Sequence, residues 1–201
     1  MVVARFAEDL SFLDELGLDA IVYNKGPPLP HTIPLPNVGR EAHTYLHHIL
    51  THYDSLADIT VFLPGSCKDS REKWLETQAV MQHVLLYRTS VFGGKPLARP
   101  LHIEQGDFKI DRWKSTNASN AAANPESHLE KCPERPLKKW YTRLGLTPVN
   151  GVCYHGIFAV TRDDIKKKPK AFYAELIAYL DSHSNPEALH YIERSWLAVF
   201  S

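Results

Sequence analysis

Short apolar runs alternate along this chain with longer segments of helical periodicity. Runs rich in β-branched and aromatic residues, which favour strands, lie at 1–6, 20–23, 58–63 and 152–160. Apolar residues that recur every three or four positions indicate helices at 8–18, 41–52, 68–84, 163–180 and 186–200. This alternation predicts a single α/β domain over residues 1–201, with a mostly parallel central sheet and helices on both faces.

Two stretches lack this periodicity. Residues 27–36 contain five prolines, and because proline fixes φ and removes a donor, this stretch is expected to be extended and irregular. Residues 93–136 are rich in Gly, Pro, Asn and Ser and are expected to form a long irregular region, with a surface loop at 117–124. Such a region is either a functional lid or a disordered insertion, and the sequence leaves both open.

Charge and cysteine content narrow the class of protein. Lys plus Arg and Asp plus Glu are both 23, and this zero formal charge argues against a nucleic-acid-binding protein, which needs a basic surface. No apolar stretch approaches the ~18 residues that span a bilayer, and no signal peptide is apparent. The three widely spaced cysteines suggest neither a disulfide framework nor a zinc site. We therefore expect a cytoplasmic protein without a membrane span.

Polar side chains follow the expected strands. Arg5 ends the first strand, Asn24 and Lys25 follow the second, and Arg40 begins a helix. Ligands of open parallel sheets bind beyond the carboxyl ends of the strands, and cations near a helix N-terminus suit a diphosphate. Asn24 offers a donor and an acceptor, which suits a base or a ribose. The same residues are also explained as solvated surface charges, and the sequence leaves both explanations open.

The known nucleotide and metal motifs are missing. Neither GxGxxG nor the P-loop motif occurs, and there is no Asp-x-Asp pair. Asp69, which follows the third strand, either binds a divalent cation or acts as a carboxylate at a helix N-terminus. His43 and His47 lie four residues apart, but HTYLH lacks the glutamate of the HExxH zinc motif. Structural roles are therefore preferred for these two histidines.

The last expected helix carries the densest set of polar residues. Glu187, His190 and Arg194 share one helical face by their spacing, whereas Glu193 is expected to point elsewhere. The apolar stripe consists of Leu189, Ile192, Trp196, Val199 and Phe200. Glu187, in the first turn, is either a proton acceptor for a substrate hydroxyl or an ion-paired capping residue.

Six sequence blocks, in order along the chain, are VVARFAEDLSFL, VYNKG, LPNVGREAHTYLHHI, LADITVFLPGS, YHGIFAVTRDDI and NPEALHYIERSWLAVF. Together they resemble a family formerly of unknown function that includes a chlorella-virus glycosyltransferase domain implicated in viral capsid glycosylation. The resemblance implies a GT-A-type fold, a UDP-sugar donor, a divalent cation that is usually manganese, and a longer multidomain chain. It also implies a hexose or a deoxyhexose such as rhamnose, a glycan or glycoprotein acceptor and, for a viral protein, the host cytoplasm.

The resemblance assigns donor binding to the first part of the chain. The residues expected at the nucleotide and its diphosphate are Ala4, Arg5, Phe6, Asn24, Lys25, Arg40 and Ser66. Asp69 is the expected metal ligand, although relatives often have a histidine after this acid and the present chain has Ser70. If no metal binds, the three basic side chains have to neutralise the diphosphate alone.

The resemblance places the base and the acceptor later in the chain. Glu187 matches a glutamate that follows a proline in some metal-independent glycosyltransferases, and it is the expected general base for an inverting transfer. Tyr154, His155 and His190 are expected on the acceptor side. The prediction requires Glu187 to open onto the same hollow as Asp69 and the donor-binding residues.

Two other functions stay open on the sequence. A non-catalytic nucleotide- or carbohydrate-binding domain would bind UDP without turnover. A phosphate-handling hydrolase that uses His43, His47 and Asp69 would need a metal and would show no preference for UDP.

Overall fold

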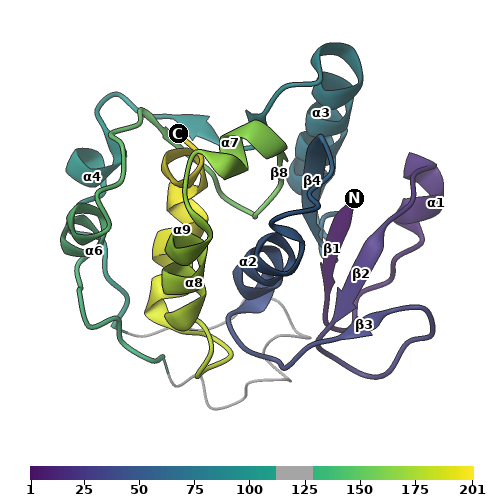
Figure 1. The fold of residues 1–201 in the computed structure, drawn as a ribbon, viewed down its shortest axis with the longest axis horizontal. Coiled ribbons are helices and arrows are strands. Elements are labelled where there is room, and N and C mark those ends of the chain that lie inside the picture. The colour runs from purple at the N-terminus through teal and green to yellow at the C-terminus, as the bar shows by residue number, and fades with distance from the viewer. Residues whose placement is uncertain (112–128) are drawn as a thin grey trace.

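The computed structural model describes residues 1–111 and 129–201 (Figure 1). The strands are β1 (Val2–Arg5), β2 (Ile21–Asn24), β3 (Ile33–Pro34), β4 (Ile59–Pro64), β5 (Val91–Phe92), β6 (Lys95–Pro96), β7 (Gly151–Val152) and β8 (Phe158–Thr161). The described helices are α1 (Phe12–Leu16), α2 (Arg40–His52), α3 (Arg71–Tyr87), α4 (Leu101–Glu104), α6 (Leu137–Arg143), α7 (Arg162–Lys166), α8 (Lys170–Ala178) and α9 (Glu187–Val199).

Six strands form the central sheet in the order β3-β2-β1-β4-β8-β5. β1 is parallel to both neighbours, and Val3 lies opposite Val22 of β2 and Leu63 of β4. β8 is antiparallel to β4 and β5. The chain lays β2 and β3 on one side of β1 and then returns through α2 to place β4 on the other side. The predicted mostly parallel sheet is confirmed, and its strand order reverses between β1 and β4.

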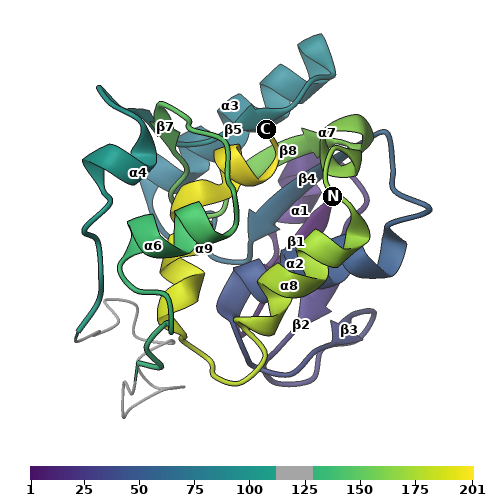
Figure 2. The ribbon, with the colours of Figure 1, turned by 60° about the vertical axis from the view of Figure 1, so that its left-hand side comes forward.

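Alternate side chains of the strands pack against different layers of helices, as the pleat of a strand requires. Val2 and Phe62 face a core formed with α2, α8 and α9. Val3 and Leu63 face a second core formed with α1 and α3. Figures 1 and 2 show these helices on the two faces of the sheet. The predicted helices on both faces are thus confirmed, and burial on both faces explains the nearly continuous apolar runs of these strands.

Two of the expected helices differ from the helices in the structure. α1 is shorter than the expected segment 8–18, and Gly17, at φ +61°, ends it with a left-handed cap. The expected helix 163–180 is two helices, α7 and α8, because Pro169 lacks the N–H that an uninterrupted helix needs. Pro169 instead stands at the N-cap of α8.

The expected strand 152–160 is also divided. β7 pairs with β6 in a small two-stranded sheet, whereas β8 belongs to the central sheet. Between them His155 and Gly156 both have φ +65°, and two such residues in succession form a tight turn. A Cβ atom on Gly156 would lie 3.1 Å from Cγ of Glu41. The turn therefore brings the start of β8 against the start of α2.

The expected irregular region 93–136 contains regular structure in its described part. β6 and α4 lie within it, whereas the expected surface loop 117–124 lies outside the described residues. All three cysteines are free and buried. Over the two described ranges, no helix has both the length and the apolar composition needed to span a membrane.

The histidines of α2 pack inside the protein. His43 and His48 are buried, the ring of His43 stacks on that of His47, and Nδ1 of His48 lies 3.1 Å from the hydroxyl of Tyr23. Burial, helped by neighbouring positive charges, lowers the pKa of His43 to about 3 and that of His48 to about 4. Both histidines are therefore neutral near neutral pH, which suits the structural role.

We expect the fold to lose stability in acid because of these histidines. The unfolded chain protonates histidine near pH ~6.5, whereas folded His48 takes up its proton only near pH 4. Stability that is complete above pH ~6.5 is therefore lost as the pH falls, by roughly 2 kcal/mol for His48 at pH ~4.5. Urea unfolding across this range measures the loss. His48→Gln, which keeps an acceptor for Tyr23, should flatten the pH dependence, and the exposed control His31→Asn should not.

Candidate functional site

The loops that follow β1, β2 and β4 pack against one another at the carboxyl edge of the sheet. The backbone N–H of Phe6 donates to Oε2 of Glu8 over 2.6 Å. A Cβ atom on Gly26 would lie 1.7 Å from the carbonyl oxygen of Phe6, and one on Gly65 would lie 3.1 Å from that of Ala4. Glycine at these two positions therefore allows the backbones of the three loops to touch.

Arg5 and Asn24 support these loops. Nη1 of Arg5 donates to Oδ1 of Asn24 over 2.9 Å, and its Nε donates to the carbonyl of Glu8 over 3.1 Å. Nδ2 of Asn24 donates to the carbonyl of Pro27 over 2.8 Å, and Asn24 and Ala4 are both buried. In this structure the two polar side chains shape the edge of the site, and their contact with a nucleotide stays a prediction.

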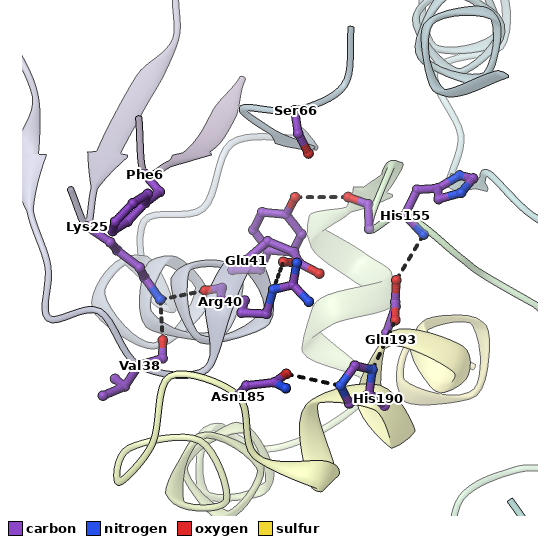
Figure 3. A network of polar contacts seen from close by, with 12 residues as sticks. Phe6, Lys25, Val38, Arg40, Glu41, Ser66, His155, Asn185, His190 and Glu193 are labelled. Atoms are coloured by element: carbon purple, nitrogen blue, oxygen red, sulfur yellow. Dashed lines mark hydrogen bonds and ion pairs between the residues drawn. The ribbon is translucent and has the colours of Figure 1, made fainter. Parts of the chain in front are cut away.

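Eight residues gather beyond the strand ends, as Figure 3 shows. We call them the polar cluster, and its members are Phe6, Lys25, Arg40, Glu41, Ser66, His155, His190 and Glu193. They come from the loops after β1, β2 and β4, from the first turn of α2, from the turn before β8, and from α9. The polar cluster thus lies where the strand order reverses, the position at which open α/β sheets bind ligands.

Lys25 shapes the start of α2. Its buried Nζ donates to the carbonyl oxygens of Val38 and Arg40, each over 2.5 Å. Burial lowers the pKa of Lys25 to about 7, although the charges of Glu41 and Asp181 oppose this shift. Lys25 therefore carries only part of a positive charge near neutral pH, and it fixes the turn that presents Arg40.

Lys73 adds a cation that the sequence analysis missed. Its Nζ donates to Oγ of Ser66 over 3.1 Å, from the first turn of α3. The side chain of Ser70 caps α3 by accepting from the N–H of Lys73. The sequence could have indicated Lys73, because the helix expected at 68–84 follows the central strand expected at 58–63. The first turn of such a helix lies near the end of the strand.

Glu41 and Glu193 are the acidic members of the polar cluster, and the sequence analysis assigned neither to the site. Oε1 of Glu193 accepts from the backbone N–H of His155 over 3.1 Å, and its Oε2 lies 4.0 Å from Nδ1 of His190. Burial, and then the charge of Glu41, raise the pKa of Glu193, while neighbouring arginines act in the opposite direction. Glu193 has other partners than Glu187, in keeping with the expectation that the two point to different sides, but it is Glu193 that lies in the polar cluster.

Two residues of the polar cluster have a strained backbone. Among the described residues, the non-glycine residues with positive φ are His31, Arg40, Arg88 and His155. Arg40 has φ +44° and His155 has φ +65°, in a region that costs side-chain-bearing residues roughly 1–3 kcal/mol. Such strain persists where the surrounding structure enforces it, and it gathers at functional sites.

Glu187 lies outside the polar cluster, in surroundings that do not suit its expected role as general base. Its side chain has no exposed surface. The carboxylate accepts from the N–H groups of Ile110 and Cys132 and from the hydroxyl of Tyr191, each over 2.9 Å. Nε of Arg135 lies 3.1 Å from Oε2. These partners hold the carboxylate inside the protein, where it cannot reach a substrate hydroxyl.

Asp69 is exposed between β4 and α3, and its backbone N–H donates to the carbonyl of Ser66. Within the part of the chain that the structure describes, no group of three or more His, Cys, Asp or Glu side chains is placed to hold a metal ion. His43 and His47 therefore form no such group with Asp69. The manganese site implied by the resemblance, with Asp69 as its ligand, stays a prediction.

Tyr154 makes its contacts outside the polar cluster. Its hydroxyl accepts from Nε2 of Gln105 over 3.0 Å, and the guanidinium of Arg194 lies 5.3 Å from the centre of its ring. The segment Tyr154–His155 also lines a separate cavity beside α3. Of the expected acceptor-side residues, His155 and His190 are in the polar cluster and Tyr154 is not.

The fold and the polar cluster define an α/β domain with a candidate ligand site at the reversal point of its sheet. The whole chain, residues 1–201, matches the family described as a protein of unknown function (DUF3431), and it belongs to that family. No curated protein and no solved structure matches the chain. Any function therefore has to be argued from the residues of the site.

Proposed function

We propose that the protein is a glycosyltransferase that moves a hexose or deoxyhexose from a UDP-sugar to a hydroxyl of a glycan or glycoprotein, with inversion. The observation that carries the proposal is that each of the six sequence blocks resembling glycosyltransferase domains contributes to the polar cluster. The mostly parallel sheet is in keeping with the GT-A-type fold that the resemblance implies. A cytoplasmic setting and a place in a longer chain belong to the same proposal.

The cations of the site suit the donor diphosphate. Arg40 stands at the N-terminus of α2, and Lys73, in the first turn of α3, contacts Ser66. Arginine and helix N-termini bind phosphate well, because their N–H groups point at its oxygens and the helix dipole favours negative charge. The ring of Phe6 offers an apolar face to the uracil. We assign no step to a metal, because no group of three or more metal-ligating side chains is found among the described residues.

Glu193 is the group that we assign to accept the proton of the acceptor hydroxyl. As the hydroxyl oxygen bonds to the anomeric carbon, the bond between that carbon and the UDP oxygen breaks. UDP leaves with its charge, and the proton passes to the carboxylate. The N–H of His155 fixes Oε1 of Glu193, and the raised pKa of Glu193 makes it a stronger base than an ordinary glutamate.

UDP should raise the melting temperature of the protein more than GDP or a nicotinamide cofactor does, because a ligand that binds only the native state stabilises it. Arg40→Gln should weaken UDP binding about tenfold or more, since it removes a charge-assisted contact to phosphate. The exposed Arg162→Gln serves as the control. Melting curves and calorimetric titrations with UDP, with and without manganese, give both quantities.

The same titrations separate the alternatives. UDP binding without consumption of any UDP-sugar in a donor panel would favour a non-catalytic binding domain. Equal responses to UDP and to the unrelated nucleotides, or an unchanged UDP affinity in Arg40→Gln, would contradict a donor site at the polar cluster.

A further inference from the structure

A cavity of about 450 Å³ adjoins the polar cluster at His155. It lies between α3 and the segment that carries β5 and β6, and the residues that matter here are Glu72, Glu76, Phe92, Lys95, Tyr154 and His155. Its volume is in the range of small-molecule sites, which is roughly 300–1,000 Å³. The proposed donor site does not use this cavity.

His155 connects the two sites. Its backbone N–H donates to Glu193 in the polar cluster, while Nδ1 of its ring lies 2.8 Å from Oε2 of Glu76 in the cavity. Figure 3 shows the ring directed away from the centre of the polar cluster. The left-handed backbone of His155 makes this arrangement possible, because it turns the peptide towards α9 and the ring towards α3.

The chemistry of the cavity suits a neutral, hydroxyl-rich ligand. The carboxylate of Glu72 lies 3.5 Å from the ammonium of Lys95, and that of Glu76 lies beside the ring of His155, whose pKa it raises. Each of these basic groups already faces a carboxylate, so the cavity offers a phosphate no surplus of positive charge, whereas carboxylates accept hydrogen bonds from hydroxyl groups. Tyr154 and Phe92 add aromatic surface to the lining, and such surface packs against the apolar face of a sugar ring.

We propose that this cavity binds the acceptor as a neutral sugar, and that Glu76 and His155 orient its hydroxyl towards Glu193. The inference rests on the proposed glycosyl transfer and names the place of its second substrate. The donor diphosphate then lies at the cations of the polar cluster, and the hydroxyl groups of the neutral acceptor lie at the carboxylates of the cavity, which accept their hydrogen bonds.

The test is a set of ¹H–¹⁵N correlation spectra of the protein titrated with methyl glycosides of glucose, galactose, mannose, rhamnose and xylose. At least one glycoside should shift the amide signals of Gly93 and Gly94, which line the cavity. Glu76→Gln should weaken that binding by about tenfold, because it removes a charged hydrogen-bond acceptor. His155→Asn should weaken it as well, since asparagine tolerates the left-handed backbone but lacks the ring. The exposed Glu104→Gln is the matched control.

UDP in the same experiment keeps this inference separate from the proposed function. If UDP shifts signals of the polar cluster while no glycoside, with or without UDP, shifts those of the cavity, the acceptor site is overturned and the donor site stands. If a glycoside binds the cavity and UDP binds nowhere, the cavity is a sugar site and the proposed transfer fails. Wild-type shifts decide the matter even if a variant does not fold.

Discussion

Replacing Glu193 with glutamine is expected to lower kcat for sugar transfer by about 10²–10⁴-fold, the usual contribution of a general acid–base group. Glutamine has the same size and still accepts the N–H of His155, but it cannot take the proton of the acceptor hydroxyl. UDP affinity should change little, because the phosphate contacts that we propose come from Arg40 and Lys73. Initial rates of UDP release from a panel of UDP-sugars measure the effect.

The pH dependence of kcat/KM tests the same assignment independently. Burial and the charge of Glu41 raise the pKa of Glu193. As the pH falls, the wild type should therefore lose activity above pH ~4.3, the pKa of an ordinary glutamate. The residual activity of Glu193→Gln should lack this acidic limb. Glu41→Gln should move the limb to lower pH without removing it. An undiminished rate in Glu193→Gln, or the same limb in that variant, would remove Glu193 from the mechanism.

Unfolding is not expected to explain the loss of activity in Glu193→Gln. A carboxyl whose pKa is raised in the folded state stabilises the fold fully at low pH, and this contribution is lost as the pH rises through the folded value. Near neutral pH the ionised side chain therefore acts against folding. The glutamine variant should be at least as stable as the wild type in urea.

The central strands were predictable because burial on both faces leaves a local signature. β2 (Ile21–Asn24) and β4 (Ile59–Pro64) lie close to the runs expected at 20–23 and 58–63. The two-residue strands β3 and β5 have no such signature, because they exist only through pairing with β2 and β8. Helical periodicity predicted one helix at 163–180, whereas Pro169 divides this segment into α7 and α8.

The position of the polar cluster was predictable from the sequence, but which glutamate of α9 belongs to it was not. Parallel strands end at one edge, so the topology alone brings Phe6 and Ser66 together. On α9 the apolar stripe is flanked by two polar faces, one with Glu187 and one with Glu193. Which face meets the polar cluster depends on how α9 docks against α2 and β7, and that information is not local. The position of Glu187 after a proline therefore suggested a carboxylate that the structure places outside the polar cluster.

Glu187→Gln should lower the free energy of unfolding by about 3–5 kcal/mol, the cost of removing one partner from a buried, hydrogen-bonded charge pair. The carboxylate serves four donors, which are two backbone N–H groups, the hydroxyl of Tyr191 and the guanidinium of Arg135. A glutamine amide turns one of these acceptors into a donor that faces other donors. Urea unfolding near neutral pH measures the loss.

Glu175→Gln is the matched control, because it breaks a pair between Arg143 and a glutamate that are both well exposed, and such pairs contribute about 0–1 kcal/mol. If Glu187→Gln costs no more than this control, the carboxylate is not a structural element and its role in catalysis has to be reconsidered. If it costs several times more while the folded fraction keeps its kcat, the two glutamates of α9 are separated by function: Glu187 maintains the fold, and Glu193 is left as the base.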